Sequence, residues 1–195
     1  MRAARQYRGT VAKYLITGVA GSGKSTVAQA LSERGYRAYD TDDLPEVTRL
    51  EDQGGRPVEW PEGPVDWSEY AWNWQEAGLR KLLAGPGSVF VAAIASNQAR
   101  FYSLFEAILV LVVDPVTLRN RLLSRTENDY GKHPDELAGI LSYHAELESE
   151  LRSAPRAAAI DATRPSRAVV DEIIARTRPT VTPEPEQPSG VRRRF

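Results

Sequence analysis

The run Gly-Val-Ala-Gly-Ser-Gly-Lys-Ser at positions 18–25 constrains the fold of this chain more than any other feature of its sequence. An apolar segment at 11–17 precedes it, and a helical pattern with Val27, Ala30 and Leu31 on one face follows it. Glycines at this spacing let backbone N–H groups curl around phosphate oxygens at the start of a helix. Because strand, loop and helix occur in the required order, the run predicts a phosphate-binding loop; a glycine-rich turn with a chance Lys-Ser pair is the alternative.

The loop assigns a role to its polar residues. Lys24 is predicted to reach the β- and γ-phosphates of ATP, and the Ser25 hydroxyl is predicted to ligate Mg²⁺. ATP and Mg²⁺ are therefore the cofactors that we expect. The residues predicted to contact the nucleotide are Gly18, Gly21, Ser22, Gly23, Lys24, Ser25 and Thr26.

Short apolar runs alternate with helical patterns along the rest of the chain. Runs such as Ile-Leu-Val-Leu-Val-Val are nearly continuous, which is typical of parallel strands covered on both faces. The alternation predicts an α/β fold of the P-loop NTPase type, with a doubly wound five-stranded parallel sheet and helices on both faces. The predicted strands are 11–17, 37–39, 89–93, 108–113 and 157–160.

The length of 195 residues fits one domain, which we place at 1–177. Segment 45–75 is rich in Pro, Gly, Glu and Trp and is interpreted as a substrate-side insertion. Segment 126–134 is polar and is interpreted as a lid. Residues 178–195 are rich in proline and charge, cannot bury a core, and are predicted to be a disordered tail.

Composition excludes several classes of function. The 25 basic residues nearly balance 26 acidic ones, which gives no electrostatic reason to expect a nucleic acid or an anionic membrane as partner. The absence of cysteine excludes disulfides and thiolate chemistry. No long apolar stretch of signal or membrane type is present, so we expect a soluble cytoplasmic protein with a small-molecule partner. The sequence leaves the oligomeric state open.

An acidic cluster, Asp40-Thr41-Asp42-Asp43, follows the second predicted strand. Doubly wound sheets bind ligands at the carboxyl ends of their strands, so these side chains are expected beside the phosphate-binding loop. Carboxylates there can hold the Mg²⁺ shell and accept a proton from an attacking hydroxyl. A solvated turn that caps the following segment is the alternative.

The loop followed by Asp40-Thr41-Asp42 resembles the shikimate kinase branch of the nucleoside and nucleoside-monophosphate kinase superfamily. The resemblance implies that Asp40 serves Mg²⁺ and that Asp42 serves the substrate hydroxyl. The segment before the last predicted helix resembles the adenine-side loop of these kinases, which implies that Arg164 and Pro165 flank the base. The chain lacks the triple glycine after the third strand and the substrate-clamping arginines of shikimate kinases, which disfavours shikimate itself.

Two other segments offer substrate contacts. After the third strand, Asn97 is predicted to read polar groups of the substrate and Arg100 to meet a phosphate; a polar loop leading into a buried helix face is the alternative. Four tryptophans, at 60, 67, 72 and 74, lie in the insertion. Trp72 is the preferred stacking residue, whereas burial in the core is the usual fate of tryptophan.

Arginines on the helix before the lid are candidates for stabilising transferred charge. Arg121 and Arg125 are one helical turn apart, so both are able to face one ligand. Lys132 is a further lid candidate, and the alternative for the arginines is a solvated helix face. Asp114, before Pro115, is interpreted as a helix N-cap.

These features predict an ATP-dependent phosphotransferase with Lys24, Asp42, Arg121 and Arg125 as its catalytic residues. A nucleoside or nucleoside monophosphate is the first choice of acceptor, and another hydroxylated metabolite is the second. An ATP-binding regulatory protein with slow hydrolysis is the rival from a different class. Because fold does not fix function, the acceptor is the least determined part of the prediction.

Overall fold

The computed structural model describes residues 12–126 and 129–179. The sheet predicted from the sequence is confirmed: five parallel strands lie in the order β2-β5-β1-β6-β7, with β1 in the centre. Most of the tail predicted at 178–195 and the basic start of the chain lie outside the described residues. The strands of this sheet are β1 (Lys13–Thr17), β2 (Arg37–Asp40), β5 (Val89–Ala92), β6 (Ala107–Val112) and β7 (Ala157–Asp161).

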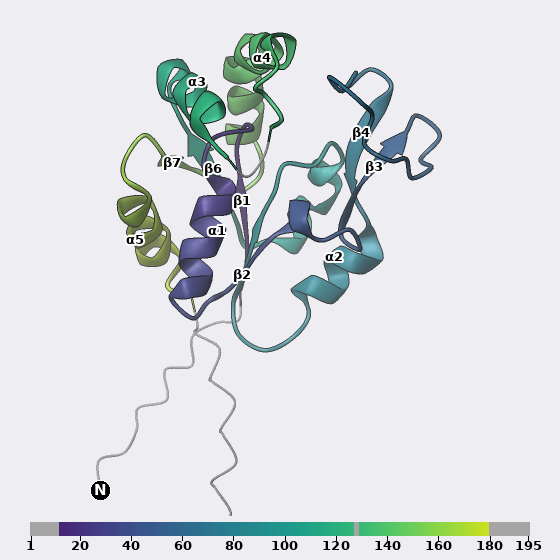
Figure 1. Ribbon diagram of the computed structural model, residues 1–195. Helices are drawn as coiled ribbons and strands as arrows, with labels where there is room; N and C mark the ends of the chain where they lie inside the picture. The colour runs from purple at the N-terminus through teal and green to yellow at the C-terminus, as the bar shows by residue number, and fades with distance from the viewer. Residues whose placement is uncertain (1–11, 127–128, 180–195) are drawn as a thin grey trace, which may run out of the picture.

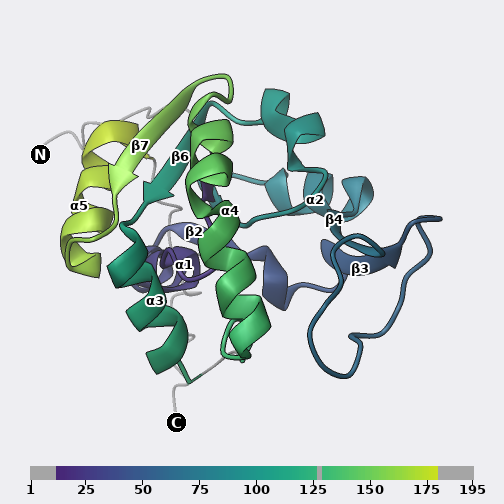
Figure 2. The same ribbon diagram turned by 90° about the horizontal axis from the view of Figure 1, so that it is seen from above.

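Helices cover both faces of the sheet (Figure 1). On one face α1 (Lys24–Glu33) and α5 (Ser166–Thr177) pack side by side over β1 and β6. On the other face lie α2 (Glu76–Leu83), the 3₁₀ segment η2 (Gln98–Leu104) and the C-terminal part of α4 (Pro134–Arg152). The remaining helix, α3 (Pro115–Ser124), packs with the start of α4 near the carboxyl ends of the strands (Figure 2).

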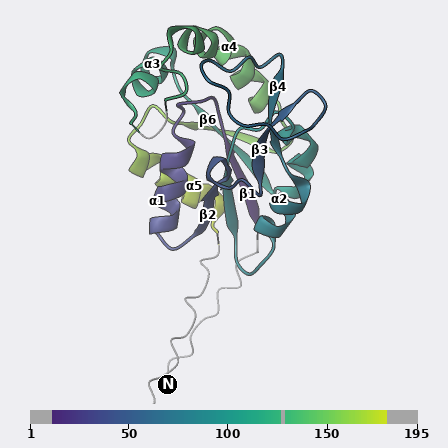
Figure 3. The same cartoon turned by 45° about the vertical axis from the view of Figure 1, so that its right-hand side comes forward.

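The insertion contains structure that the sequence analysis did not predict. After η1 (Thr41–Asp43), β3 (Thr48–Asp52) and β4 (Tyr70–Trp74) form an antiparallel hairpin outside the main sheet. Figure 3 shows that β4 reaches toward the end of the molecule where α3 and α4 lie. The hairpin therefore stands next to the edge of the sheet at which ligands of α/β proteins bind.

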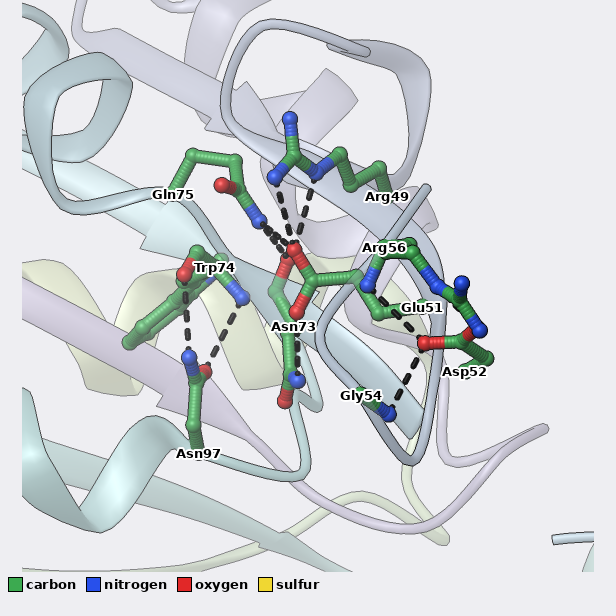
Figure 4. Close-up of polar contacts among 9 residues, drawn as sticks. All are labelled: Arg49, Glu51, Asp52, Gly54, Arg56, Asn73, Trp74, Gln75 and Asn97. Atoms are coloured by element: carbon green, nitrogen blue, oxygen red, sulfur yellow. Dashed lines mark hydrogen bonds and ion pairs between the residues drawn. The ribbon is translucent and has the colours of Figure 1, made fainter. Parts of the chain in front are cut away.

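A buried carboxylate holds the two hairpin strands together (Figure 4). Glu51 is 7 % exposed and accepts hydrogen bonds from Arg49 Nε at 2.9 Å, Asn73 Nδ2 at 2.8 Å and Gln75 Nε2 at 2.9 Å. Burial alone would raise the pKa of Glu51, but these hydrogen bonds together lower it. Glu51 thus acts as a structural anchor of the insertion.

Gly78 in α2 is required by close packing rather than by its backbone conformation. A Cβ atom at this position would lie 1.9 Å from the carbonyl oxygen of Glu46, which is backbone and has little room to move. Gly139 in α4 is a matched control, because nothing lies within 4 Å of a Cβ atom built there.

We expect Gly78→Ala to lower the free energy of unfolding by about 2–3 kcal/mol, since the clash outweighs the gain in helix propensity. Gly139→Ala should raise it by about 0.5–1 kcal/mol, because alanine favours the helix over glycine. Urea denaturation of both variants measures the difference. Equal stabilisation by the two substitutions would contradict the close approach of α2 to Glu46.

Candidate active site

The phosphate-binding loop lies between β1 and α1, and its glycines are needed for its shape. Gly21 and Gly23 adopt positive φ angles of 83° and 101°. A Cβ atom on Gly21 would lie 2.9 Å from the side chain of Leu122, so the loop packs tightly against α3. Gly23 is the N-cap of α1 and offers no side-chain cap, which leaves the first N–H groups of the helix available to an anion.

Lys24 lies across this loop. Its side chain is buried, and Nζ donates hydrogen bonds to the carbonyl oxygens of Gly18 at 2.9 Å and Val19 at 3.1 Å. Burial lowers the pKa of Lys24, while the nearby carboxylates of Asp42 and Asp40 act in the opposite direction. The ammonium group is therefore held between the loop and the acidic cluster.

The acidic cluster begins where β2 ends, as the sequence predicted. Asp40 Oδ1 accepts a hydrogen bond from the backbone N–H of Asp42 at 3.1 Å and so caps η1. Asp42 Oδ1 accepts a hydrogen bond from Trp72 Nε1 at 2.8 Å. Asp42 is exposed within the cavity, and desolvation by the surrounding walls raises the pKa of its carboxyl, an effect that the Trp72 hydrogen bond and the charge of Lys24 partly offset. A carboxylate with a raised pKa beside a buried ammonium is suited to proton transfer.

The donor set beside the loop fits Mg²⁺. The Ser25 hydroxyl is exposed in the first turn of α1, and the Asp40 carboxylate lines the same cavity. Both are hard oxygen ligands, and Mg²⁺ usually takes only one or two protein ligands alongside phosphate oxygens and water. Within 12–126 and 129–179, no group of three or more His, Cys, Asp or Glu residues could hold a metal without such help.

One cavity of about 2390 Å³ joins the loop to the insertion. We define two parts of its wall. The loop half is formed by residues of the phosphate-binding loop, α1, α3 and the segment 162–169. The insertion half is formed by lining residues from 60–72, from 94–102 and from the α4 residues Tyr143, Leu147, Glu150 and Leu151. Asp40 and Asp42 lie between the two halves, since Lys24 is near both and Trp72 donates to Asp42. The lining residues from 129–134 also lie between them, because Tyr130 contacts Trp60 and Trp67 of the insertion half.

The predicted lid arginines lie in the wall of the loop half. Arg121 donates to the carbonyl oxygens of Ser22 at 3.2 Å and Ala162 at 2.7 Å, so it joins the phosphate-binding loop to the segment after β7. Arg125 donates to the carbonyl oxygen of Tyr130 and holds the described part of the lid. Both arginines are thus placed where they can face a phosphate group; their catalytic roles stay predictions.

Two other predictions concern the rim of the loop half. Arg164 and Pro165 line the cavity, and Arg164 forms ion pairs with Asp161 and Glu172. Their contact with an adenine ring stays a prediction. Lys132 lines the cavity in the lid and pairs with Asp129 at 2.7 Å.

The structure places Asn97 and Arg100 away from the cavity, which does not support the substrate contacts predicted for them. The Asn97 side chain accepts from Trp74 N and donates to Trp74 O, both at 2.9 Å, and so fastens the segment after β5 to β4 (Figure 4). The guanidinium of Arg100 lies over the ring of Phe101, 5.9 Å from its centroid. Asn97 thus has a structural role, and Arg100 is exposed on the surface.

The polar residues of this segment that do line the cavity are Ser96, Gln98 and Tyr102, none of which was the preferred candidate from the sequence. Gln98 is buried and accepts a hydrogen bond from Thr17 Oγ1 at 3.3 Å. The direction of each side chain here depends on the 3₁₀ turns of η2, whose existence the sequence pattern did not show. Two adjacent amides, Asn97 and Gln98, were therefore indistinguishable in the sequence.

The tryptophans of the insertion divide between core and cavity. Trp74 is buried against Phe101 and Phe105, and its Nε1 donates to Thr41 Oγ1 at 3.0 Å. The other three line the cavity. Trp60 makes edge-on contacts with Trp67, Trp72 and the lid residue Tyr130, and Trp67 Nε1 donates to the Tyr130 hydroxyl at 2.9 Å.

Asp114 has the capping role that the sequence predicted. Its side chain accepts hydrogen bonds from the N–H groups of Val116 and Thr117, both at 2.9 Å, at the start of α3. It does not line the cavity, and no catalytic role is needed to explain it.

Comparison with known proteins agrees with this architecture. A family model described as "AAA domain" matches residues 15–142, which is more than half of the chain. Among curated proteins, none matches the sequence.

No helix in the described ranges 12–126 and 129–179 is long and apolar enough to cross a membrane.

Solved structures of kinases share the fold at low sequence identity. A gluconokinase from Sinorhizobium meliloti 1021 has a TM-score of 0.54 at 23 % identity, over 86 % of this chain and 92 % of that chain. Deoxyadenosine kinase from M. mycoides has a TM-score of 0.51 at 12 % identity, over 84 % and 98 %. Shikimate kinase from Bacteroides thetaiotaomicron has a TM-score of 0.51 at 16 % identity, over 84 % and 97 %. These likenesses establish the fold.

Proposed function

From the premise that this chain belongs to the AAA domain family and has the fold of the P-loop small-molecule kinases, we propose that it transfers the γ-phosphoryl group of ATP to a hydroxyl group of a small molecule. The observation that carries the proposal is the position of Asp42. Its carboxylate has a raised pKa, lies near Lys24, and lines the cavity that also contains the phosphate-binding loop.

Phosphoryl transfer requires positioning and charge stabilisation more than covalent chemistry from the protein. The N–H groups of the loop and Lys24 would hold the phosphates, with Lys24 exchanging the carbonyl oxygens of Gly18 and Val19 for phosphate oxygens. Ser25 and Asp40 would hold Mg²⁺, which neutralises charge on the transferred group when bound. Arg121 of α3 and Arg125, which directly follows α3, would face the charge on the transferred phosphoryl group.

Asp42 would orient the acceptor hydroxyl and take its proton. Its Oδ1 is occupied by the Trp72 indole, and within the described part of the chain no hydrogen bond to Oδ2 is found, so Oδ2 is free to accept the proton. A general base must lie within hydrogen-bond reach of the proton that it removes. Nucleosides, nucleoside monophosphates and other hydroxylated metabolites are the acceptors to consider, and the cytoplasm, which supplies ATP, is the proposed location of the reaction.

The test is ADP release from Mg-ATP against a panel of these three acceptor classes. An acceptor that raises turnover well above hydrolysis by water supports the kinase. Tight ATP binding with no acceleration by any acceptor would instead favour a nucleotide-binding regulatory protein with slow hydrolysis.

Trp72 is expected to position Asp42 and to tune its pKa, which makes Trp72→Phe informative. The substitution keeps an aromatic ring but removes the N–H that stabilises the ionised Asp42 carboxylate. Because the base acts in its ionised form, the acidic limb of the pH profile of kcat/KM should move to higher pH in the variant. An unchanged pH profile would show that the indole N–H has no effect on the base.

Trp60→Phe is the matched control for this measurement. Trp60 lies in the same aromatic cluster, but no hydrogen bond joins its side chain to a carboxylate among the described residues. Its substitution should change KM without moving the acidic limb.

A further inference from the structure

Basic side chains are unevenly distributed in the wall of the cavity. Among the described residues, every Lys or Arg that lines it belongs to the phosphate-binding loop, to α3 or the residue that follows it, to the lid, or to the segment after β7. The insertion half, within the described residues, has none. The five basic residues are Lys24, Arg121, Arg125, Lys132 and Arg164.

These basic groups already have partners. Arg121 is bound to the carbonyl oxygens of Ser22 and Ala162, and Arg164 is paired with Asp161 and Glu172. Lys132 is paired with Asp129 of the lid at 2.7 Å. Since Lys24 and the arginines face the nucleotide phosphates in the proposed function, no cation remains in the described wall for a second anionic group.

The insertion half has aromatic faces and negative charge instead. Trp60, Trp67 and Trp72 form one part of it, and Tyr102 of η2 also lines it. Glu150 lines the wall from α4, is exposed, and lies close enough to Tyr102 for its charge to act on that phenol. Together with Asp42, Glu150 gives the acceptor side two carboxylates.

We infer that the acceptor carries neither phosphate nor carboxylate: it is a neutral or amine-bearing hydroxylated molecule with one apolar or aromatic face that lies on an indole ring. An anionic group placed here would lose water beside carboxylates and find no Arg fork, which is unfavourable. Sugar faces, aromatic bases and ammonium groups are the partners that tryptophan rings accept. This inference rests on the proposed function and removes nucleoside monophosphates from its acceptors.

Acceptors that differ in charge test the inference. Glucose, glucosamine and gluconate form one set, and deoxyadenosine with its 3′-monophosphate, which keeps the 5′-hydroxyl, forms another. In any set that is turned over, we expect the neutral or amine-bearing member to have a kcat/KM at least roughly tenfold above its anionic partner, because like charges disfavour the anion. Preference for the anionic partner would overturn the inference while leaving the kinase proposal intact.

A charge reversal in the wall provides a second test. Glu150→Arg supplies the missing cation and should shift the ratio of kcat/KM toward the anionic partner by roughly fivefold or more. Glu146→Arg makes the same change of charge on the exposed surface of α4, outside the cavity wall, and should leave the ratio unchanged. Equal shifts in both variants, or no shift in Glu150→Arg, would contradict the assigned role of the wall.

Binding without turnover separates failure of this inference from failure of the proposed function. Three tryptophans line the cavity, so tryptophan fluorescence of the full chain reports binding of each compound in the absence of ATP. If no compound is phosphorylated, the kinase proposal fails. A fluorescence response to the neutral or amine-bearing members alone then still supports the inference, and a stronger response to the anionic members, or none to any, overturns it.

Discussion

Lys24→Ala is expected to lower acceptor-dependent ATP turnover by about 10²–10⁴-fold, which is the range for loss of a central charge-stabilising group. Lys24 is the buried cation of the phosphate-binding loop and lies near the carboxylates of Asp40 and Asp42. Alanine leaves nothing in its place to draw the γ-phosphate toward the acceptor. The measurement is kcat with saturating acceptor, together with a thermal unfolding curve that shows the variant to be folded.

Lys81→Ala is the matched control for this change. Lys81 is exposed on α2 and does not line the cavity, so its loss should change kcat by less than roughly twofold, as expected for an isolated surface residue. If Lys24→Ala keeps most of the activity of the unmodified chain, the loop does not bind the reacting phosphates and the account of the site is wrong.

Asp42→Asn should lower kcat by about 10²–10⁴-fold, since it removes a general base while keeping the shape of the side chain. The Trp72 indole can still donate to the amide oxygen, so the loss reports the missing proton acceptor rather than a lost contact. Slow ATP hydrolysis in the absence of acceptor should be little affected, because water does not depend on the acceptor side of the cavity.

The same variant carries a stability signature. The pKa of Asp42 is raised in the folded chain, so the folded state favours the protonated carboxyl. The protonated carboxyl of Asp42 therefore contributes to the free energy of unfolding at pH values below its pKa in the unfolded chain. This contribution is lost as the pH rises through the pKa of Asp42 in the folded chain. Asp42→Asn should therefore match the original chain in acid and exceed its stability near neutral pH.

Asp43→Asn is the control for both readouts. Asp43 is the adjacent carboxylate and also lines the cavity, but no hydrogen bond to its side chain is found among the described residues. The variant should keep kcat within roughly threefold, as is usual for a change at an exposed position. Loss of activity in Asp43→Asn with activity kept in Asp42→Asn would reassign the base.

The main sheet could be predicted because its inner strands β5 and β6 are nearly continuous apolar runs. Such a run is specified by burial on both faces, and the turn residues that bound it fix its limits to within a residue or two. The phosphate-binding loop could be predicted because its backbone geometry requires glycine at fixed positions, as at Gly21 against Leu122. Asp40 and Asp42 followed from the strand that precedes them.

The hairpin of the insertion could not be predicted in the same way. The strand β3 carries the buried carboxylate of Glu51, which is satisfied by Arg49 of the same strand, Asn73 of β4 and Gln75 just after β4. A local pattern does not show that such polar groups will find each other. Nor could it show that Asn97 binds the backbone of Trp74 while the adjacent Gln98 lines the cavity.

The transfer of a radiolabelled γ-phosphate from Mg-ATP tests the central claim most directly. The chain is incubated with a neutral hydroxylated acceptor that accelerates ADP release, and the label is followed into organic product or inorganic phosphate. We predict that the label appears in a phosphorylated acceptor and that Asp42→Asn abolishes this product. Label found in inorganic phosphate alone, at a rate that no acceptor changes, would contradict phosphoryl transfer at this site.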